Sequence, residues 1–386
     1  VRLTAHIRQA GAAGQVIASQ TVESAIASAA SASRLDLWWL PATMRRNSTP
    51  RMPSVPDTPF ESPLSSVTAH QAIEAARQHL NSAVIGQSHL VERMLMTLLC
   101  GGHFLVEGAP GLAKTRAIKA LADIVEGDFH RIQFTPDLLP SDVTGTEIYR
   151  PEDGSFNFQQ GPIFHNLILA DEINRAPAKV QSALLEAMAE NQVSFGRQTF
   201  ALPTLFMVMA TQNPIEQEGT YALPEAQQDR FLLHVLVDYP DRQAEADILR
   251  LVRDENAGAQ AAGNKPAPTL MTQAQIHQAR QELLALHMAE PVERYIVELI
   301  LATRTPPSEL APLIELGASP RGTIGLDLCA RAHAWLAQRD FVTPDDVQAV
   351  AGDVLRHRLI CSFEADAQGL TSDYLIDQLL QRVPVP

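Results

Sequence analysis

One segment constrains this chain more than any other: residues 108–115 read Gly-Ala-Pro-Gly-Leu-Ala-Lys-Thr, between an apolar stretch and a helical pattern. A glycine-containing loop between a strand and a helix is the context of a phosphate-binding loop, or P-loop. Backbone N–H groups and the helix N-terminus would hold phosphates, Lys114 would neutralise the β and γ oxygens, and the Thr115 hydroxyl would ligate Mg²⁺. Ala113 replaces the consensus glycine, which is tolerable with helix-like backbone angles and costly with a positive φ. The motif alone therefore leaves an ordinary strand-to-helix turn open.

An acidic pair follows a second apolar stretch further along the chain. Residues 167–170 read Leu-Ile-Leu-Ala and are followed by Asp171 and Glu172. A carboxylate at the tip of a buried strand can hold Mg²⁺ through water, and a second one beside it can orient and polarise the attacking water. A surface acidic pair is the alternative, but a P-loop upstream in the same sheet makes it the weaker one. We therefore predict Thr115 and Asp171 as the Mg²⁺ ligands and Glu172 as catalytic.

Three further polar residues are candidates for the same catalytic site. Asn213 follows the fourth predicted strand and could position the lytic water, the alternative being a turn-forming Asn before Pro. Arg230 directly precedes the fifth predicted strand, where it could be an arginine finger or form a salt bridge to Asp229. Arg321 lies just ahead of a predicted helix, where the helix dipole disfavours a cation unless an anion such as a phosphate is near. An exposed loop arginine is the alternative for Arg321.

The nucleotide contacts are predicted from two stretches of sequence. Residues 84–87, Val-Ile-Gly-Gln, precede a helix and the P-loop strand and could form a turn against adenine. The predicted nucleotide-binding residues are Ile85, Gly86, Gly108, Pro110, Gly111, Leu112, Ala113, Lys114, Thr115 and Arg116.

Short apolar runs alternate with helical patterns from residue 103 onward, which predicts a parallel α/β sheet. Between residues 178 and 191, apolar side chains recur at i, i+3, i+4, i+7 and i+8, the spacing of one buried helix face. Two hairpins, 146–159 and 193–202, are predicted to interrupt the alternation without being needed to close the sheet. The predicted strands of the sheet are 103–107, 131–134, 167–170, 205–210 and 232–237.

Composition divides the chain into four parts. Residues 1–63 contain an Ala/Ser stretch and several prolines, which predicts a disordered tail; because the chain begins with Val, an over-extended gene start with initiation at Met44 or Met52 is a second explanation. Residues 64–240 are the predicted nucleotide-binding core. Residues 241–270 are a predicted linker that includes an Ala/Gly/Asn/Pro-rich segment, and residues 271–386 a helical lid. Within the lid, Thr-Pro-Asp-Asp at 343–346 predicts a helix start.

Charge and cysteine usage exclude several classes of protein. The formal net charge of −14 argues against non-specific nucleic-acid binding, because phosphate binding requires clustered Lys and Arg. Cys100, Cys329 and Cys361 are far apart and lack CxxC spacing, so neither a disulfide framework nor a zinc site is predicted. No apolar run is long enough to span a bilayer, and the start lacks a signal-peptide pattern. We therefore expect a cytoplasmic protein without membrane insertion.

Because the motifs described above occur in this order along the chain, the segment from about residue 65 to residue 358 resembles the MoxR family of AAA+ ATPases. The resemblance is carried by the Val-Ile-Gly-Gln turn, by a P-loop of the form Gly-x-Pro-Gly-x-Ala-Lys-Thr, and by an acidic strand that continues as Glu-Ile-Asn-Arg-Ala-Pro. It is also carried by Ala-Thr-Gln-Asn-Pro at 210–214, by Glu-Gly-Thr-Tyr-Ala-Leu-Pro-Glu-Ala-Gln at 218–227 before Asp-Arg-Phe, and by Gly-Ala-Ser-Pro-Arg at 317–321. An alanine at the position of Ala113 is usual in this family.

The resemblance implies an α/β P-loop AAA+ fold: an αβα core with a five-stranded parallel sheet, β-hairpin inserts and a C-terminal all-α lid. It implies sensor 1 at Asn213, a trans-acting arginine finger at Arg230 and sensor 2 at Arg321. Arg175 and Arg197 are further residues that could share the finger role. The hairpins look like the helix-2 and pre-sensor-1 inserts of this branch, which usually face a ring pore or a client.

The family also implies a biological role. Its members are generally seen as chaperone-like ATPases that use ATP and Mg²⁺, act as rings, and assemble or activate other complexes, often by inserting metal or cofactor. A homo-oligomeric ring, most simply a hexamer, is implied, together with a client complex and a partner that carries a von Willebrand factor A domain.

Two other functions stay open at this point. A related AAA+ motor, such as a magnesium-chelatase motor subunit or an MCM-like nucleic-acid motor, would share the motifs, although the acidic balance argues against the second. A nucleotide-gated scaffold would bind ATP and change its oligomeric state without useful turnover. The presence of Glu172 and Asn213 argues against such a scaffold.

Overall fold

The computed structural model describes residues 67–152, 154–196, 198–214, 219–259 and 268–386. The predicted tail, both candidate start methionines and Arg197 lie outside the described residues. Among the described helices, none combines the length and the apolar character that a membrane span requires.

The central sheet has five parallel strands in the order β2-β5-β8-β1-β9. Their side chains alternate between two apolar clusters: Leu167 and Leu169 belong to one, Ile168 and Ala170 to the other. Since both faces are covered, the inner strands are nearly continuous apolar runs. The prediction of a five-stranded parallel sheet is confirmed, with small shifts at the strand ends. The strands are β1 (Phe104–Gly108), β2 (Phe129–Gln133), β5 (Leu167–Asp171), β8 (Met207–Gln212) and β9 (Leu233–Val237).

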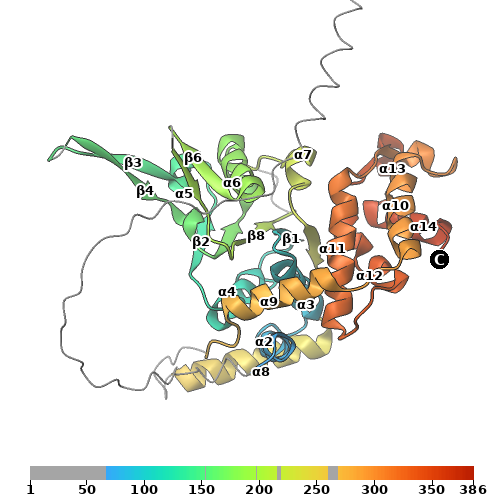
Figure 1. Cartoon of the computed structure of the whole chain (residues 1–386), viewed down its shortest axis with the longest axis horizontal. Helices are drawn as coiled ribbons and strands as arrows, with labels where there is room; N and C mark the ends of the chain where they lie inside the picture. The colour runs from blue at the N-terminus through green and yellow to red at the C-terminus, as the bar shows by residue number, and fades with distance from the viewer. Residues whose placement is uncertain (1–66, 153, 197, 215–218, 260–267) are drawn as a thin grey trace, which may run out of the picture. The chain divides into compact units, whose positions relative to one another are not determined.

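Helices cover both faces of this sheet (Figure 1). The larger cluster contains side chains from α2 (Ala69–Ala83), α3 (Ser88–Cys100), α4 (Lys114–Ile124) and α9 (Gln273–Ala285). The smaller cluster lies under α5 (Pro140–Thr144) and α6 (Ala178–Glu190). The predicted apolar face of α6 is buried, and the helix ends at Glu190 because Asn191 adopts the left-handed conformation with φ 51°.

Both predicted hairpins are present. The first pairs β3 (Gly145–Arg150) with β4 (Ser155–Gln160), and the second pairs β6 (Gln192–Phe195) with β7 (Gln198–Ala201). Phe158 joins them, because its ring stacks on Phe200 with centroids 4.3 Å apart and lies 5.7 Å from Phe195. Tyr149 and Phe156 contact each other on the first hairpin and are largely exposed.

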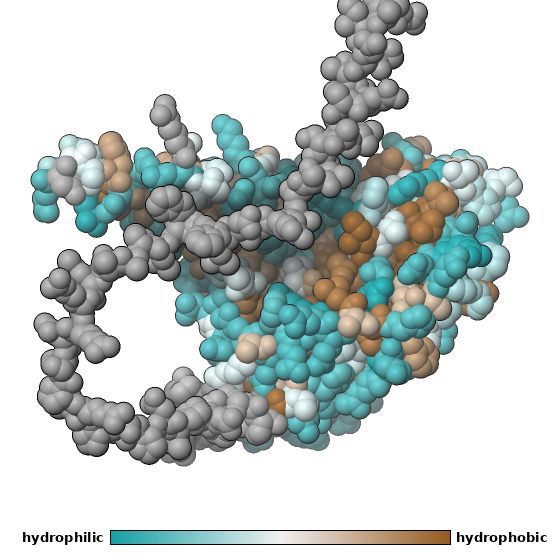
Figure 2. Space-filling view, viewed as in Figure 1, coloured by the Kyte–Doolittle hydropathy of each residue, from teal (hydrophilic) through white to brown (hydrophobic). Residues whose placement is uncertain are grey.

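After α9, the predicted lid contains five further α-helices and one short ladder. The predicted helix start at Thr343 is present as a capping box with Asp346. The ladder pairs β10 (Ile314–Leu316) with β11 (Ile360–Cys361), so the lid is not purely helical as predicted. Figure 2 shows apolar surface on the lid side, and exposed Val297, Ile324 and Phe363 belong to lid helices. The helices are α10 (Glu290–Arg304), α11 (Pro320–Leu336), α12 (Pro344–Leu355), α13 (Phe363–Ala367) and α14 (Ser372–Arg382).

The first part of the predicted linker forms a helix, α8 (Arg242–Ala259). The Ala/Gly/Asn/Pro-rich composition of residues 256–268 suggested a linker, but residues 242–255 hold helix formers and carry acidic Glu245 in the first turn. The boundaries of the core and lid domains stay a prediction.

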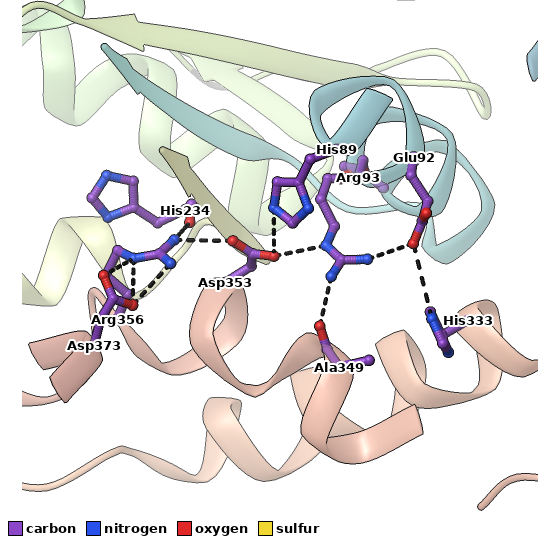
Figure 3. Close-up of polar contacts among 10 residues, drawn as sticks. His89, Glu92, Arg93, His234, His333, Ala349, Asp353, Arg356 and Asp373 are labelled. Carbon is purple, nitrogen blue, oxygen red and sulfur yellow. Dashed lines mark hydrogen bonds and ion pairs between the residues drawn. The ribbon is translucent and has the colours of Figure 1, made fainter. Parts of the chain in front are cut away.

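A chain of ion pairs joins the lid to the helices beneath the sheet (Figure 3). Asp353 on α12 accepts a hydrogen bond from Nε of Arg93 on α3 at 2.7 Å, and its other oxygen lies 3.0 Å from Arg356. Nε2 of His89 lies 3.1 Å from the same carboxylate. Arg356 also pairs with Asp373 on α14 and donates to the His234 carbonyl of β9. Two arginines and one histidine therefore surround one buried carboxylate at this junction.

Candidate functional site

The P-loop crosses the carboxyl edge of the sheet between β1 and α4. Gly111 has φ 84°, a conformation that glycine adopts without steric cost. Gly108 is required for close packing, since a Cβ there would lie 2.6 Å from the Val237 carbonyl oxygen. Lys114 begins α4, and its Nζ donates to the carbonyls of Gly108 at 2.6 Å and Gln212 at 3.3 Å. The lysine ammonium is thereby held at the edge where β1 and β8 end.

Ala113 has φ 57° and ψ 14°, in the left-handed region. The sequence left open whether this residue has helix-like angles or a positive φ, and the structure has the positive φ. Such a conformation costs a non-glycine residue roughly 1–2 kcal/mol. Glu172 has φ 57° as well, so two strained residues flank one site. Clustered strain of this kind is characteristic of functional sites.

The acidic pair lies at the end of β5. Asp171 is 8% exposed, accepts from Oγ1 of Thr211 at 2.6 Å, and accepts from Nε and Nη2 of Arg131 at 3.0 and 2.7 Å. Oε2 of Glu172 accepts from Nε2 of Gln133 at 2.8 Å and lies 3.0 Å from Nε of Arg175. Both carboxylates therefore have an arginine beside them.

A cavity of about 340 Å³ brings the P-loop and the acidic pair together. Asn213, only 5% exposed, contributes to its wall from the end of β8. The cavity combines hydroxyl and carboxylate oxygens, which suit Mg²⁺, with an ammonium and a helix N-terminus, which suit phosphate. The lining residues are Pro110, Gly111, Leu112, Ala113, Lys114, Thr115, Arg116, Asp171, Glu172, Thr211 and Asn213.

The donor set fits Mg²⁺ held together with a nucleotide. Within the described ranges, no three His, Cys, Asp or Glu side chains form a cluster that could hold a metal ion alone. Mg²⁺ in nucleotide sites is bound by one or two protein oxygens plus phosphate oxygens and water. Thr115 and Asp171 are among the side chains with oxygen atoms that line this cavity, and they are the two predicted Mg²⁺ ligands.

A second cavity, of about 240 Å³, adjoins the first across the P-loop. The two share the P-loop wall and Arg116. Apolar side chains line much of the second cavity, as expected for a nucleobase subsite. Ile85 lines it as predicted, whereas Gly86 lies behind the wall, packed against α8. The remaining lining residues are Ala83, Val84, Gln87, Tyr239, Pro240, Glu245, Ile248, Leu251 and Val252.

Four predicted site residues lie outside the walls of both cavities: Gly86, Gly108, Arg230 and Arg321. Arg230 follows the short helix α7 (Glu225–Gln228), and its Nη1 donates to the Leu185 carbonyl of α6 at 2.6 Å. Arg321, at the start of α11, lies 3.6 Å from Asp229. Asp229 also pairs with buried Arg358 at 2.8 Å, so the lid contacts the turn that carries Arg230.

Sequence reasoning missed the residues that hold the acidic pair in place. Arg131 and Gln133 were covered by a predicted strand and given no role, although their i, i+2 spacing puts them on one face of β2. Thr211 was part of a quoted motif and was also given no role. Polar residues near the carboxyl end of a strand beside the acidic strand were the available signal.

Comparison with known proteins first defines the class. Residues 103–233 match the family described as ATPase family associated with various cellular activities (AAA), and residues 308–379 match the AAA lid domain. The fold and the cavity at its sheet edge are accordingly those of an AAA ATPase, a class whose membership implies ATP hydrolysis.

Individual relatives then narrow the class to one family. Chaperone MoxR1 of Mycobacterium tuberculosis is 43% identical over 320 residues, which cover 81% of this chain and 82% of that relative. Protein MoxR of Paracoccus denitrificans is 34% identical over 342 residues, covering 82% and 97%. A crystal structure from Cytophaga hutchinsonii, described as that of a candidate ATPase, is 43% identical with a TM-score of 0.75, covering 82% of this chain and 96% of that one. This chain belongs to the MoxR family of AAA ATPases.

Proposed function

We propose that this chain is a Mg²⁺-dependent, ATP-hydrolysing subunit of a homo-oligomeric ring, in which each ATP site is completed by Arg230 of a neighbouring copy. One observation carries the proposal: the cavity gathers Lys114, Asp171, Glu172 and Asn213, while Arg230 lies outside its walls and donates to a carbonyl of α6. A phosphoryl-transfer site gains a large rate factor from an arginine at the transferred group. Arg230 would supply that arginine to the site of a neighbouring subunit.

Each residue of the cavity has a proposed part in this reaction. Lys114 and the P-loop N–H groups bind the β- and γ-phosphates, and Thr115 and Asp171 hold Mg²⁺, directly or through water. The bound Mg²⁺ supplies charge neutralisation on the phosphate oxygens. Glu172 polarises the attacking water and Asn213 orients it. Arg321 acts as sensor 2 after leaving Asp229, and Arg175, which pairs with Glu172 of its own subunit, is a further candidate finger for a neighbouring site.

The biological role that we propose is chaperone-like remodelling or activation of a partner complex, including metal or cofactor insertion. The support is the family and its relative named Chaperone MoxR1. A hexamer, a cytoplasmic location and a partner with a von Willebrand factor A domain belong to this proposal. The exposed Tyr149 and Phe156 on the first hairpin offer an apolar contact for a client, and the apolar lid surface offers one for a neighbouring subunit.

Mixing two inactive variants tests the shared site. Glu172→Gln keeps the arginine finger and loses the water-polarising carboxylate, whereas Arg230→Ala keeps the carboxylate and loses the finger. If the sites are shared, an equimolar mixture of the two proteins should regain ATP turnover, because in randomly assembled rings about a quarter of the interfaces combine both intact halves.

Two controls define the outcomes of the mixing experiment. Each variant alone, at the same total concentration, gives the baseline rate, and size-exclusion chromatography shows whether the two copies assemble. A mixture that assembles and stays at the baseline would contradict completion of the site in trans.

A further inference from the structure

The helix α8 has an unusual position beside the second cavity. All residues from Arg242 to Glu255 are at least partly exposed, although the helix spans Arg242–Ala259. In Figure 1 it lies on the side of the helices away from the sheet. A helix without buried side chains over most of its length gains little from the hydrophobic core. Elements of this kind open at low free-energy cost, well below that of global unfolding.

This weakly packed helix forms one wall of the proposed nucleobase cavity. Ile248, Leu251 and Val252 line the cavity from α8, opposite Val84 and the P-loop. Tyr239, just before α8, also lines it and is 68% exposed. A base in the cavity would therefore have α8 along one of its walls.

Two attachments hold α8 over the cavity, one near each end. At the start of the helix, Pro240 and Ala244 pack on Gly86 so closely that a Cβ on this glycine would lie 2.9 Å from the Ala244 Cβ. Towards the other end, both oxygens of Glu255 accept from the guanidinium of Arg116, one of them at 3.1 Å. Arg116 also donates through Nε to the Ala83 carbonyl at 2.6 Å, so it ties α8 to the last turn of α2 and the first turn of α4.

We propose that Glu255 is a positioning residue for the nucleotide: through Arg116 it latches α8 over the nucleobase cavity and slows the release of bound nucleotide. The inference rests on the proposed function, because it takes the two cavities to be one nucleotide site. Arg116 lines both cavities, so the latch lies where base and phosphates meet. The hydrogen bond from Arg116 lowers the pKa of Glu255, which keeps the carboxylate charged at neutral pH.

If Glu255 acts as a latch, replacing it should change the rate of nucleotide release in the opposite direction to the loss of its charge alone. Removing a carboxylate near a polyphosphate site weakens repulsion and by itself slows nucleotide release. Removing the latch frees α8 and speeds release. Partly exposed ion pairs have modest strength, so we expect Glu255→Gln to raise the dissociation rate about two- to fivefold.

The experiment uses the full chain with Mg²⁺ and a fluorescent ADP, N-methylanthraniloyl-ADP, displaced by excess ADP in a stopped-flow instrument. Asp254→Asn is the matched control, because it removes the same charge one residue away on the same helix. We expect faster release from Glu255→Gln, unchanged or slower release from Asp254→Asn, and intermediate release from Glu255→Asp. Raising the salt concentration should speed release from the parent protein more than from Glu255→Gln, because salt screens the ion pair in addition to the phosphate contacts that both proteins share.

The measured release rates test the latch, and the binding of fluorescent ADP tests the proposed function. Release from Glu255→Gln that is unchanged or slower than from the parent, with folding intact by circular dichroism, would overturn the latch. Equal acceleration in Asp254→Asn would overturn it too, because the effect would then not depend on the Arg116 ion pair. Absence of fluorescent ADP binding to the parent protein would instead contradict the proposed function.

Discussion

Replacing Glu172 with glutamine is expected to lower ATP turnover by about 10²–10⁴-fold and to leave nucleotide affinity close to that of the parent protein. The reason is that Glu172 lines the cavity beside Asp171 and Thr211, whereas the phosphate-binding groups come from the P-loop across it. Glutamine keeps the size of the side chain and its place beside Gln133 but cannot accept a proton. Steady-state ATP hydrolysis and calorimetric titration with ADP and Mg²⁺ measure the two effects.

Lys114→Ala is the matched comparison for this prediction. It removes the ammonium that the Gly108 and Gln212 carbonyls hold at the sheet edge. A lost charge-assisted contact to phosphate should weaken nucleotide binding by about 10–100-fold. Equal affinity in Lys114→Ala and the parent would contradict the P-loop assignment, and full turnover in Glu172→Gln would contradict the role of the carboxylate.

Replacing Asp353 with alanine is expected to lower the free energy of unfolding by about 2–4 kcal/mol, because it removes the buried one of the two carboxylates that pair with Arg93 and leaves the more exposed Glu92 as its partner. The side chains of Asp353 and Arg93 are both 5% exposed, and Arg93 also donates to the Ala349 carbonyl at 2.6 Å. Urea unfolding at pH 7, followed by circular dichroism, measures the change.

The double variant Arg93→Met/Asp353→Leu is the control for the buried pair. Replacing both charges by apolar side chains removes the buried Arg93 cation together with its buried partner, so the double variant should be more stable than Asp353→Ala. An unfolding free energy of Asp353→Ala within about 1 kcal/mol of the parent would show that water reaches Arg93 and that the junction is not a buried lock.

The same carboxylate gives a pH dependence with a defined sign. Burial alone would raise the pKa of Asp353, but the His89 hydrogen bond and the Arg93 charge outweigh it and hold the pKa well below its usual range. A depressed folded-state pKa contributes stability that is present above the unfolded value of about 3.9 and is lost as pH falls below it. The stability difference between the parent and the Asp353→Ala variant should therefore shrink below about pH 4.

The local sequence was sufficient to predict those features whose structure depends on residues close to one another in the chain. The P-loop, the acidic pair and Asn213 each follow an apolar strand directly, and parallel strands bring their carboxyl ends to one edge. The apolar period of α6 and the turn residues of the hairpins are local signals of the same kind.

Contacts between distant residues could not be predicted in the same way. Arg93 and Asp353 are separated by 260 positions, and nothing in either local sequence identifies the other as its partner. The positive φ of Ala113 depends on the loop that surrounds it, so the sequence left both a helix-like and a positive φ open. Residues 242–255 were included in a predicted linker because the composition that follows them outweighed their helix-forming residues.

The central claim is that ATP is hydrolysed at sites shared between copies of this chain. The most direct test is ATP hydrolysis per subunit, measured over a wide range of protein concentration, for the parent protein and for Arg230→Ala. We predict activity that rises steeply with concentration in the parent and falls by about 10³-fold or more in Arg230→Ala. Activity that is independent of concentration and unaffected by the substitution would mean that one subunit holds the complete site, and would contradict the shared-site ring.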